Sequence, residues 1–182
     1  MAKVKWLEKT EDHDFPAAGD YLALLADSNT VKELTESLQH GTIVQHADPI
    51  ALYEHPATRE AARFVGQSNM LRGRIERGAV RSALGRIGLD GAEAPPEGTD
   101  VDVLLRPEQI RLVDGAGEAG ARGVVVQREF HGHDVLVRVR LDTAGDGDDL
   151  ILARLRGRAS PPVGASVGLL AEGTAIAWPV ET

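Results

Sequence analysis

The sequence predicts a mainly β protein, a β-sandwich or β-barrel, preceded by a small α-helical N-terminal section. One observation is that after Asn69 short runs of alternating apolar and polar residues replace the helical period, with Gly- and Pro-rich clusters between them. Another is that apolar residues before this point recur at helical spacing and follow capping signals. A hydrophobic content of 42% allows these elements to bury a packed core.

The first predicted element is a helical hairpin over residues 16–38. Pro16 suits a first helical position, and apolar residues follow at helical spacing over 18–25. Thr30 and Glu33 form a capping box that opens the second helix. Because two short helices cannot bury their apolar stripes alone, we expect the hairpin to pack on the rest of the chain or on a second copy.

The two basic residue types are separated along the chain. All four lysines lie in residues 1–40, whereas all 16 arginines lie in residues 41–182. Lysine and arginine differ physically, but not enough for one fold to separate them this cleanly. We interpret the break as a seam near His40, with residues 1–40 a helical segment of separate origin. Chance clustering of only four lysines is the alternative interpretation.

Residues 41–69 are predicted to form a helical connector. Asp48 is a good N-cap and Pro49 fits the next position, so a short helix is expected to begin there. A second helix is expected over 57–65, and Gly66 stands where a helix stop belongs. The β pattern begins directly afterwards, so residues 70–182 are predicted to form the β domain.

Eight strands are predicted in the β domain, separated by turn clusters: 71–76, 79–87, 101–105, 123–130, 135–141, 150–156, 166–170 and 174–179. The clearest pair is the hairpin that joins 123–130 to 135–141. Its turn is expected to contain His131, Gly132, His133 and Asp134, with Gly132 supplying the positive φ that a tight turn needs.

Two segments carry a resemblance to a known family. One is an apolar strand closed by Arg106, Pro107 and Glu108, where Pro107 cannot donate to a strand ladder and the strand must turn. The other, in the connector, combines a Gly start, a Pro-led helix ending in Tyr, a Pro-Ala-Thr step and an Ala-x-Phe-x-Gly-x-x-Asn close: Gly41, Gln45, Pro49, Tyr53, Pro56, Ala57, Thr58, Ala62, Phe64, Gly66 and Asn69.

These segments resemble the C-terminal regulatory region, called TOBE (transport-associated OB), of the ATP-binding subunits of bacterial ABC importers. The resemblance covers residues 41–182 and is closest to ferric-iron importers, with polyamine and sulfate importers next. Ala47 and Asp48 depart from the Gly-Thr that the family usually has before the Pro-led helix. The resemblance implies that the β domain is OB-like.

The resemblance also implies a role. In the family this region lies on the cytoplasmic side, contacts its twin in the ATPase dimer and modulates transport. We therefore expect a regulatory homodimer formed through the β domain, cytoplasmic or at the inner face of the cell membrane beside an ABC transporter complex. The family motif implies structural roles for five residues: Gly66, Asn69, Arg106, Pro107 and Glu108.

The motifs of ATP hydrolysis are absent from the printed sequence. It contains no G-x-x-x-x-G-K-[ST] phosphate loop and no Leu-Ser-Gly-Gly-Gln signature. The 40 residues before Gly41 are too few for a nucleotide-binding domain. We therefore predict no enzymatic activity and no cofactor. Two alternatives remain: a stand-alone protein that binds a small ligand or oxyanion in the barrel, and a decayed gene whose ATPase domain was replaced by an unrelated head.

Arginines on two late strands are the candidate ligand-binding residues. Forked guanidinium donors suit oxyanions, and neighbouring strands can bring these side chains onto one face. The predicted oxyanion-binding residues are Arg138, Arg140, Arg154 and Arg156, with Arg158 nearby. The alternative is an ordinary solvated sheet face, paired with the acidic residues Glu129, Asp148 and Asp149.

Two other clusters favour simpler explanations than a metal site. His131, His133 and Asp134 offer metal-ligand chemistry but supply only a partial shell, and a polar hairpin turn explains them. The acidic run 142–149 lacks the glycine and the terminal glutamate of a calcium loop at the required spacing, so a solvated loop is expected. We predict no metal.

Charge and composition exclude several partners. The net charge of −8 disfavours nucleic acid, and Phe130 and Trp178 are the only aromatic residues after residue 70, too few for a base-stacking platform. No stretch of 18 apolar residues exists, so no membrane insertion is expected, and the N-terminus lacks a signal-peptide core. The chain has no cysteine, which excludes disulfides and thiolate-bound zinc.

Overall fold

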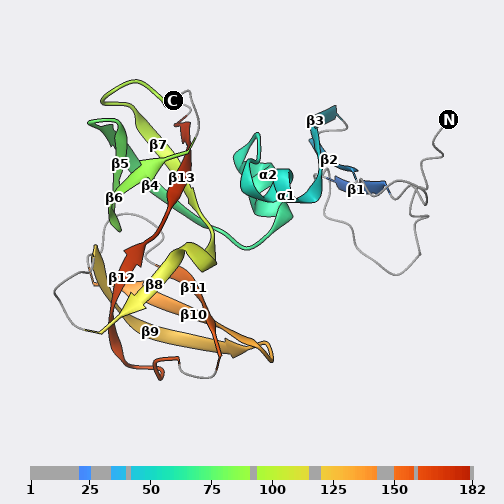
Figure 1. Cartoon of the computed structure of the whole chain (residues 1–182). Coiled ribbons are helices and arrows are strands. Elements are labelled where there is room, and N and C mark those ends of the chain that lie inside the picture. Colours follow the sequence, from blue (N-terminus) through green and yellow to red (C-terminus); the bar gives the residue numbers. More distant parts are fainter. Residues whose placement is uncertain are drawn as a thin grey trace. The chain divides into compact units, whose positions relative to one another are not determined.

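The computed structural model describes residues 21–25, 34–39, 42–90, 94–114, 120–142, 150–157 and 160–180. The chain divides into two compact units, Met1–Gly66 and Gln67–Thr182 (Figure 1). Most of the described residues lie in strands, which confirms the predicted mainly β fold. In the described ranges, no helix has the length and apolar character needed to cross a membrane.

The described strands of the first unit correct the predicted helical hairpin. β1 (Tyr21–Leu25), β2 (Leu34–Gln39) and β3 (Thr42–Ala47) form an antiparallel sheet in the order β1-β2-β3. The helical prediction for residues 16–38 is therefore wrong at 21–25 and 34–38, and the capping box at Thr30 and Glu33 lies outside the described residues. A short apolar run is compatible with a strand as well as with a helix. Here the pairing of neighbouring strands decides for the strand, and such pairing cannot be recognised from the spacing of apolar residues.

Two short helices complete the first unit, as the capping signals predict. In α1 (Pro49–Glu54), the Asp48 carboxylate accepts hydrogen bonds of 3.0 Å from the N–H groups of Ile50 and Ala51. α2 (Arg59–Val65) is capped by the Thr58 hydroxyl, and Gly66 is its C-cap in extended backbone, with φ −178°. The second helix thus begins two residues later than predicted.

The second unit contains a closed five-stranded barrel, in the order β13-β6-β5-β4-β7. Its strands are β4 (Asn69–Glu76), β5 (Ala79–Ser82), β6 (Gly85–Leu89), β7 (Asp100–Leu105) and β13 (Thr174–Pro179). All neighbours pair antiparallel except β13 and β6, which run parallel. β7 ends just before Arg106, and Pro107 opens the short 3-10 turn Pro107–Gln109.

A five-stranded antiparallel sheet forms the rest of the unit, in the order β11-β10-β9-β12-β8. Its strands are β8 (Ile110–Val113), β9 (Ala121–Phe130), β10 (Asp134–Leu141), β11 (Leu150–Arg156) and β12 (Ser166–Ala171). β9 and β10 form the predicted hairpin, with Gly132 at φ 82° in its turn. The strand predicted over 79–87 is two strands joined by a turn, and β8 was not predicted.

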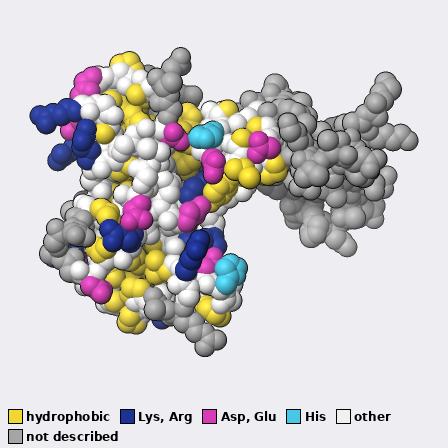
Figure 2. All heavy atoms as spheres, in the orientation of Figure 1, with side chains coloured by type: hydrophobic (Ala, Val, Ile, Leu, Met, Phe, Trp, Pro, Cys, Tyr) yellow, Lys and Arg dark blue, Asp and Glu magenta, His cyan; other side chains and the backbone are white. Residues whose placement is uncertain are grey.

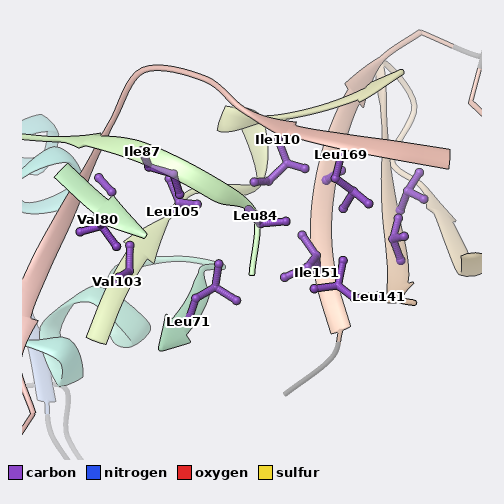
Figure 3. Packing of buried hydrophobic residues seen from close by; sticks show 14 of the residues in the cluster. Leu71, Val80, Leu84, Ile87, Val103, Leu105, Ile110, Leu141, Ile151 and Leu169 are labelled. Carbon is purple, nitrogen blue, oxygen red and sulfur yellow. The ribbon is translucent and has the colours of Figure 1, made fainter. Parts of the chain in front are cut away.

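One hydrophobic core runs through the second unit. Figure 3 shows Val80 and Val103 of the barrel, Ile151 and Leu169 of the sheet, and Leu84 between the two groups. All five are at most 2% exposed. Because barrel and sheet share this core, they are expected to unfold together.

Two glycines permit this packing. A β-carbon on Gly73 would lie 2.5 Å from a methyl group of Val80, inside the barrel. A β-carbon on Gly120 would lie 2.2 Å from the carbonyl oxygen of Leu84, where the chain that leads into β9 crosses the turn between β5 and β6. Any larger side chain at either position would force the neighbouring atoms apart.

Candidate functional site

A polar joint, formed by Gln67, Asn69, Arg106, Asp134 and Arg154, ties the start of the second unit to its sheet. Asn69 is 4% exposed. Its side-chain amide donates to the carbonyl oxygen of Leu152 at 2.9 Å and accepts from the N–H of Leu152 at 2.7 Å. Asn69 thereby satisfies two main-chain groups in the middle of β11, an edge strand of the sheet, as a neighbouring strand would.

Arg154 is the centre of the joint. One guanidinium nitrogen donates to Asp134 Oδ2 at 2.6 Å, and another donates to Gln67 Oε1 at 2.8 Å. Asp134 is 5% exposed, and its other carboxylate oxygen shows no hydrogen-bond partner among the residues that the structure describes. The hydrogen bond from Arg154 lowers the pKa of Asp134 below its ordinary value of 3.8, and the charges of Arg154, His133 and His131 act in the same direction, against the effect of burial.

The corner after β7 completes the joint. Arg106 is 5% exposed, and its guanidinium reaches the carbonyl oxygen of Gln67 at 3.4 Å. Its main-chain N–H donates to Gln109 Oε1 at 2.8 Å, and the Gln109 amide donates to the carbonyl oxygen of Thr174 at 2.7 Å. Pro107 is buried, whereas Glu108 is exposed. Asn69 pairs with Leu105, the residue before Arg106, so two residues that the sequence singled out lie close together in the sheet register, and Arg106 contacts Gln67, which the sequence did not single out.

The predicted oxyanion residues share one face of the sheet but do not converge. In the register of β10 and β11, Arg154 lies opposite Leu136 and Arg156 lies opposite Asp134, so both face the same side as Arg138 and Arg140. The four arginines follow one another along the strands, and about 20 Å separates the first from the last at 3.4 Å per residue.

Two of these four arginines already have acidic partners. Arg154 binds Asp134, and Arg138 donates to Gln127 Oε1 at 3.0 Å with Glu129 at 3.7 Å. Arg140 and Arg156 are exposed. Binding of a small oxyanion by Arg138, Arg140, Arg154 and Arg156 stays a prediction, while Arg158 lies outside the described residues.

The hairpin turn uses its polar residues within the sheet. The imidazole of His131 lies 3.8 Å from the Glu129 carboxylate. The main-chain N–H of His131 donates to the carbonyl oxygen of Asp134. The Asp134 carboxylate faces Arg154. Within the described ranges, no three His, Asp or Glu side chains group as metal ligands.

A row of arginines on the outer wall of the barrel was not predicted. Arg86 of β6 lies opposite Arg81 of β5, Arg81 lies opposite Arg74 of β4, and Arg74 lies opposite Asp100 of β7. Figure 2 shows basic side chains gathered on this side of the unit. A sequence signal existed, since turns at Arg77 and Gly78 and at residues 83 and 84 set the register that aligns these residues.

Comparison with known proteins identifies relatives that match about three quarters of the chain. The TOBE domain family matches residues 103–175. The chain is 33% identical over 144 residues to the Fe(3+) ions import ATP-binding protein FbpC of Pseudomonas fluorescens, covering 76% of this chain and 39% of the relative. It is 35% identical over 141 residues to FbpC 2 of Rhodococcus jostii, covering 76% of this chain and 39% of that protein.

A polyamine importer protein is also similar. The spermidine/putrescine import ATP-binding protein PotA of Marinobacter nauticus is 29% identical over 148 residues, covering 78% of this chain and 38% of PotA. The chain therefore spans about two fifths of the length of the curated relatives that it matches. Among solved structures, the cytoplasmic molybdate-binding protein ModG matches with a TM-score of 0.43 and 14% identity, over 60% of this chain and 94% of ModG.

Proposed function

Because the chain carries a TOBE domain and is related to the C-terminal part of ABC-importer ATP-binding proteins, we propose that it is a non-catalytic regulatory module of an ABC importer. The regulatory function itself is the proposal, since the relatives are longer proteins that contain further sequence. The chain contributes no residue to ATP hydrolysis in this proposal.

The polar joint is the observation that carries the proposal. Asn69 opens β4 and Gln67 lies two residues before it, and both stand at the end of the segment that resembles the close of an ATPase domain. Both are hydrogen-bonded to β11, and Gln67 also contacts Arg106 at the corner after β7. Such bonds hold the entrance of the β domain in one orientation, which a module that transmits position along the chain requires.

The names of the relatives support a particular importer type. The names of FbpC in two organisms refer to Fe(3+) import, so a ferric-iron importer is the proposed system, and a polyamine importer is the second choice. The module would then be cytoplasmic, at the inner face of the membrane, and its partners would be the subunits of the transporter. We also propose that it homodimerises through the β domain.

Sedimentation velocity tests the homodimer. The full chain, measured from low to high micromolar concentration, should shift from a monomer to a dimer, because the proposed regulatory contact is between two copies. A single monomeric species at high micromolar concentration would contradict this proposal. Co-expression with the importer's membrane subunits, followed by purification through a tag on the membrane subunit, tests the transporter contact. Absence of the chain from the purified complex would count against it.

The second candidate function is binding of a small oxyanion by the β10–β11 face. Arg140 and Arg156 favour it, because both are exposed and neither shows an acidic partner among the described residues. The distance along the face disfavours one ion that bridges all four arginines. Thermal shift with molybdate, tungstate and sulfate provides the test, and an unchanged melting temperature at millimolar anion rejects this candidate.

A further inference from the structure

The arginine row on the barrel wall has an unbalanced charge. It contains Arg86, Arg81 and Arg74 on successive strands, and one acidic residue, Asp100, at its end. Three positive charges against one negative charge leave an excess of two. Like charges placed directly opposite on neighbouring strands destabilise a sheet, so this arrangement costs free energy unless something neutralises it.

The three arginine side chains of the row differ in the hydrogen bonds and ion pairs that they form. Arg74 contacts Asp100 through a single nitrogen at 3.0 Å, which leaves the rest of its fork available. Arg86 donates to the carbonyl oxygen of Arg77 at 3.0 Å. The side chain of Arg81, in the middle of the row, is exposed and shows no hydrogen bond or ion pair to any residue in the described ranges.

A groove accompanies the row. It has a volume of about 580 Å³ and is lined by Arg72, Gly73, Arg74, Arg81, Ser82, Ala83, Asp100 and Val180. This volume lies in the range of small-molecule sites, about 300–1,000 Å³. Arg72 forms an ion pair of 3.0 Å with Asp102, a residue that is 7% exposed. The charge of Arg72 is therefore already neutralised, and its side chain contributes to the wall of the groove more than to its positive charge.

We propose that this groove binds a phosphate group, either free phosphate or the phosphate of a small monoester, between Arg74 and Arg81. The excess of two positive charges in the row matches a phosphate monoester, which carries about −1.5 to −2 at neutral pH. Residues opposite one another on neighbouring strands have β-carbons about 4.5–5.5 Å apart, close enough for two guanidinium forks to contact one phosphate. Ala83 and Val180 offer an apolar wall for the organic part of a monoester.

This site is separate from the predicted oxyanion face on β10 and β11, and it does not depend on the regulatory function. Its residues come from strands β4, β5 and β7 and the positions next to them, and from Val180, which directly follows β13. Phosphate is favoured over nucleic acid because the chain as a whole carries a net charge of −8, which repels a long polyanion.

Isothermal titration of the full chain with inorganic phosphate, and separately with glycerol 1-phosphate, tests the proposal. We expect saturable binding in the millimolar range or tighter, at a constant ionic strength kept with potassium chloride. Arg81→Ala should weaken binding at least about tenfold, the loss of one charged hydrogen-bond partner. Arg81→Lys should lose less, because it keeps the charge but not the fork.

Arg122→Ala is the matched control, since it removes the same charge from an exposed strand position that belongs to neither candidate anion site, and it should leave phosphate binding unchanged. Tighter binding of glycerol 1-phosphate than of phosphate identifies a monoester ligand, and equal or weaker binding identifies free phosphate. No saturable heat with either compound, or equal binding by Arg81→Ala and the unaltered chain, would overturn the proposal. Melting curves of all three variants verify that they are folded.

Discussion

Two arginine-bearing surfaces of the second unit have opposite electrostatic arrangements. On the β10–β11 face, Arg154 meets the buried Asp134, and Arg138 lies near Glu129. On the barrel wall, Arg81 lies between Arg74 and Arg86, and the only acid in that row is Asp100 at its end. On both surfaces the arginines lie on one face of the sheet, the face to which every second side chain of a strand points. The alternation of side chains along a strand therefore does not distinguish the two surfaces.

The difference between the surfaces comes from strand register. Arg154 reaches Asp134 because the register of β10 and β11 places these residues on one face, two positions apart along the ladder. On the barrel, two short hairpins align three arginines in one row. The first arrangement contributes to the stability of the fold, whereas the second is an uncompensated charge that is suited to a ligand.

The largest expected effect on stability tests whether the contacts of the polar joint with β11 stabilise the fold. Asn69→Ala should reduce the free energy of unfolding by about 1–3 kcal/mol, because it leaves the N–H and carbonyl of Leu152 without their partner in a part-buried site. Urea denaturation measures this loss. Asn69→Asp keeps the acceptor for the Leu152 N–H but sets a buried carboxylate oxygen against the Leu152 carbonyl oxygen, so it should lose at least as much. An Asn69→Ala variant as stable as the unaltered chain would contradict the role of the joint.

A smaller loss of stability is expected from substituting arginines of the β10–β11 face, and it should differ between Arg154 and Arg138. Arg154→Met should destabilise the chain less than Asn69→Ala, since Arg154 is partly exposed, but more than Arg138→Met, because it leaves the Asp134 carboxylate without its main partner. Arg138→Met removes only an exposed contact and should change the free energy of unfolding by less than about 0.5 kcal/mol. Urea denaturation of the two variants side by side decides, and equal losses would remove the distinction between the two arginines.

The dependence of stability on pH follows from Asp134. Its pKa in the folded chain lies below the ordinary value of 3.8, so the folded state binds fewer protons there than the unfolded state. This contribution is fully present above the unfolded pKa and is lost as pH falls through the folded pKa. Thermal melting between pH 7 and pH 2 should show a smaller acid-induced loss in Asp134→Asn than in the unaltered chain; identical slopes would mean that Asp134 is not stabilised by Arg154.

The smallest effect has the opposite sign and concerns the barrel wall. In the absence of phosphate and at low ionic strength, Arg81→Ala should stabilise the chain by a few tenths of a kcal/mol, about the size of one unfavourable cross-strand pair. The gain should disappear at about 1 M salt, where the screening length is about 3 Å. Melting temperatures at both salt concentrations measure it. Destabilisation at low salt would show that Arg81 makes a favourable contact and would end the contrast between the two surfaces.

Much of the fold was predictable because strands leave a local signal. Asp48 caps α1, Gly132 has the positive φ of its turn, and Pro107 follows the end of β7, all as predicted. The cap of α2 at Thr58 was not predicted, since that helix was expected to begin at residue 57. The failures have local causes as well. The run 21–25 is apolar throughout and therefore fits both periods, and β8, with four residues, follows the turn at Pro107 too closely to form a separate pattern.

The candidate site was predictable only in part. Asn69 and Arg106 entered through a family resemblance, but their contacts join residues up to 83 positions apart in the sequence. Gln67 had no distinguishing feature, because its side chain acquires a role only when Arg154 lies beside it. The arginine row needed two hairpin registers together, and the interpretation of 79–87 as one strand hid the second of them.

By itself the sequence determined the β-rich character of the chain, the capped helices, the hairpin at Gly132 and the relation to a TOBE domain, because each depends on neighbouring residues or on a contiguous motif. Only the tertiary structure decided which arginines are neutralised and which repel one another. Side-chain alternation specifies the face of a strand, but cross-strand register specifies the neighbour, and the energy of a charge depends on that neighbour.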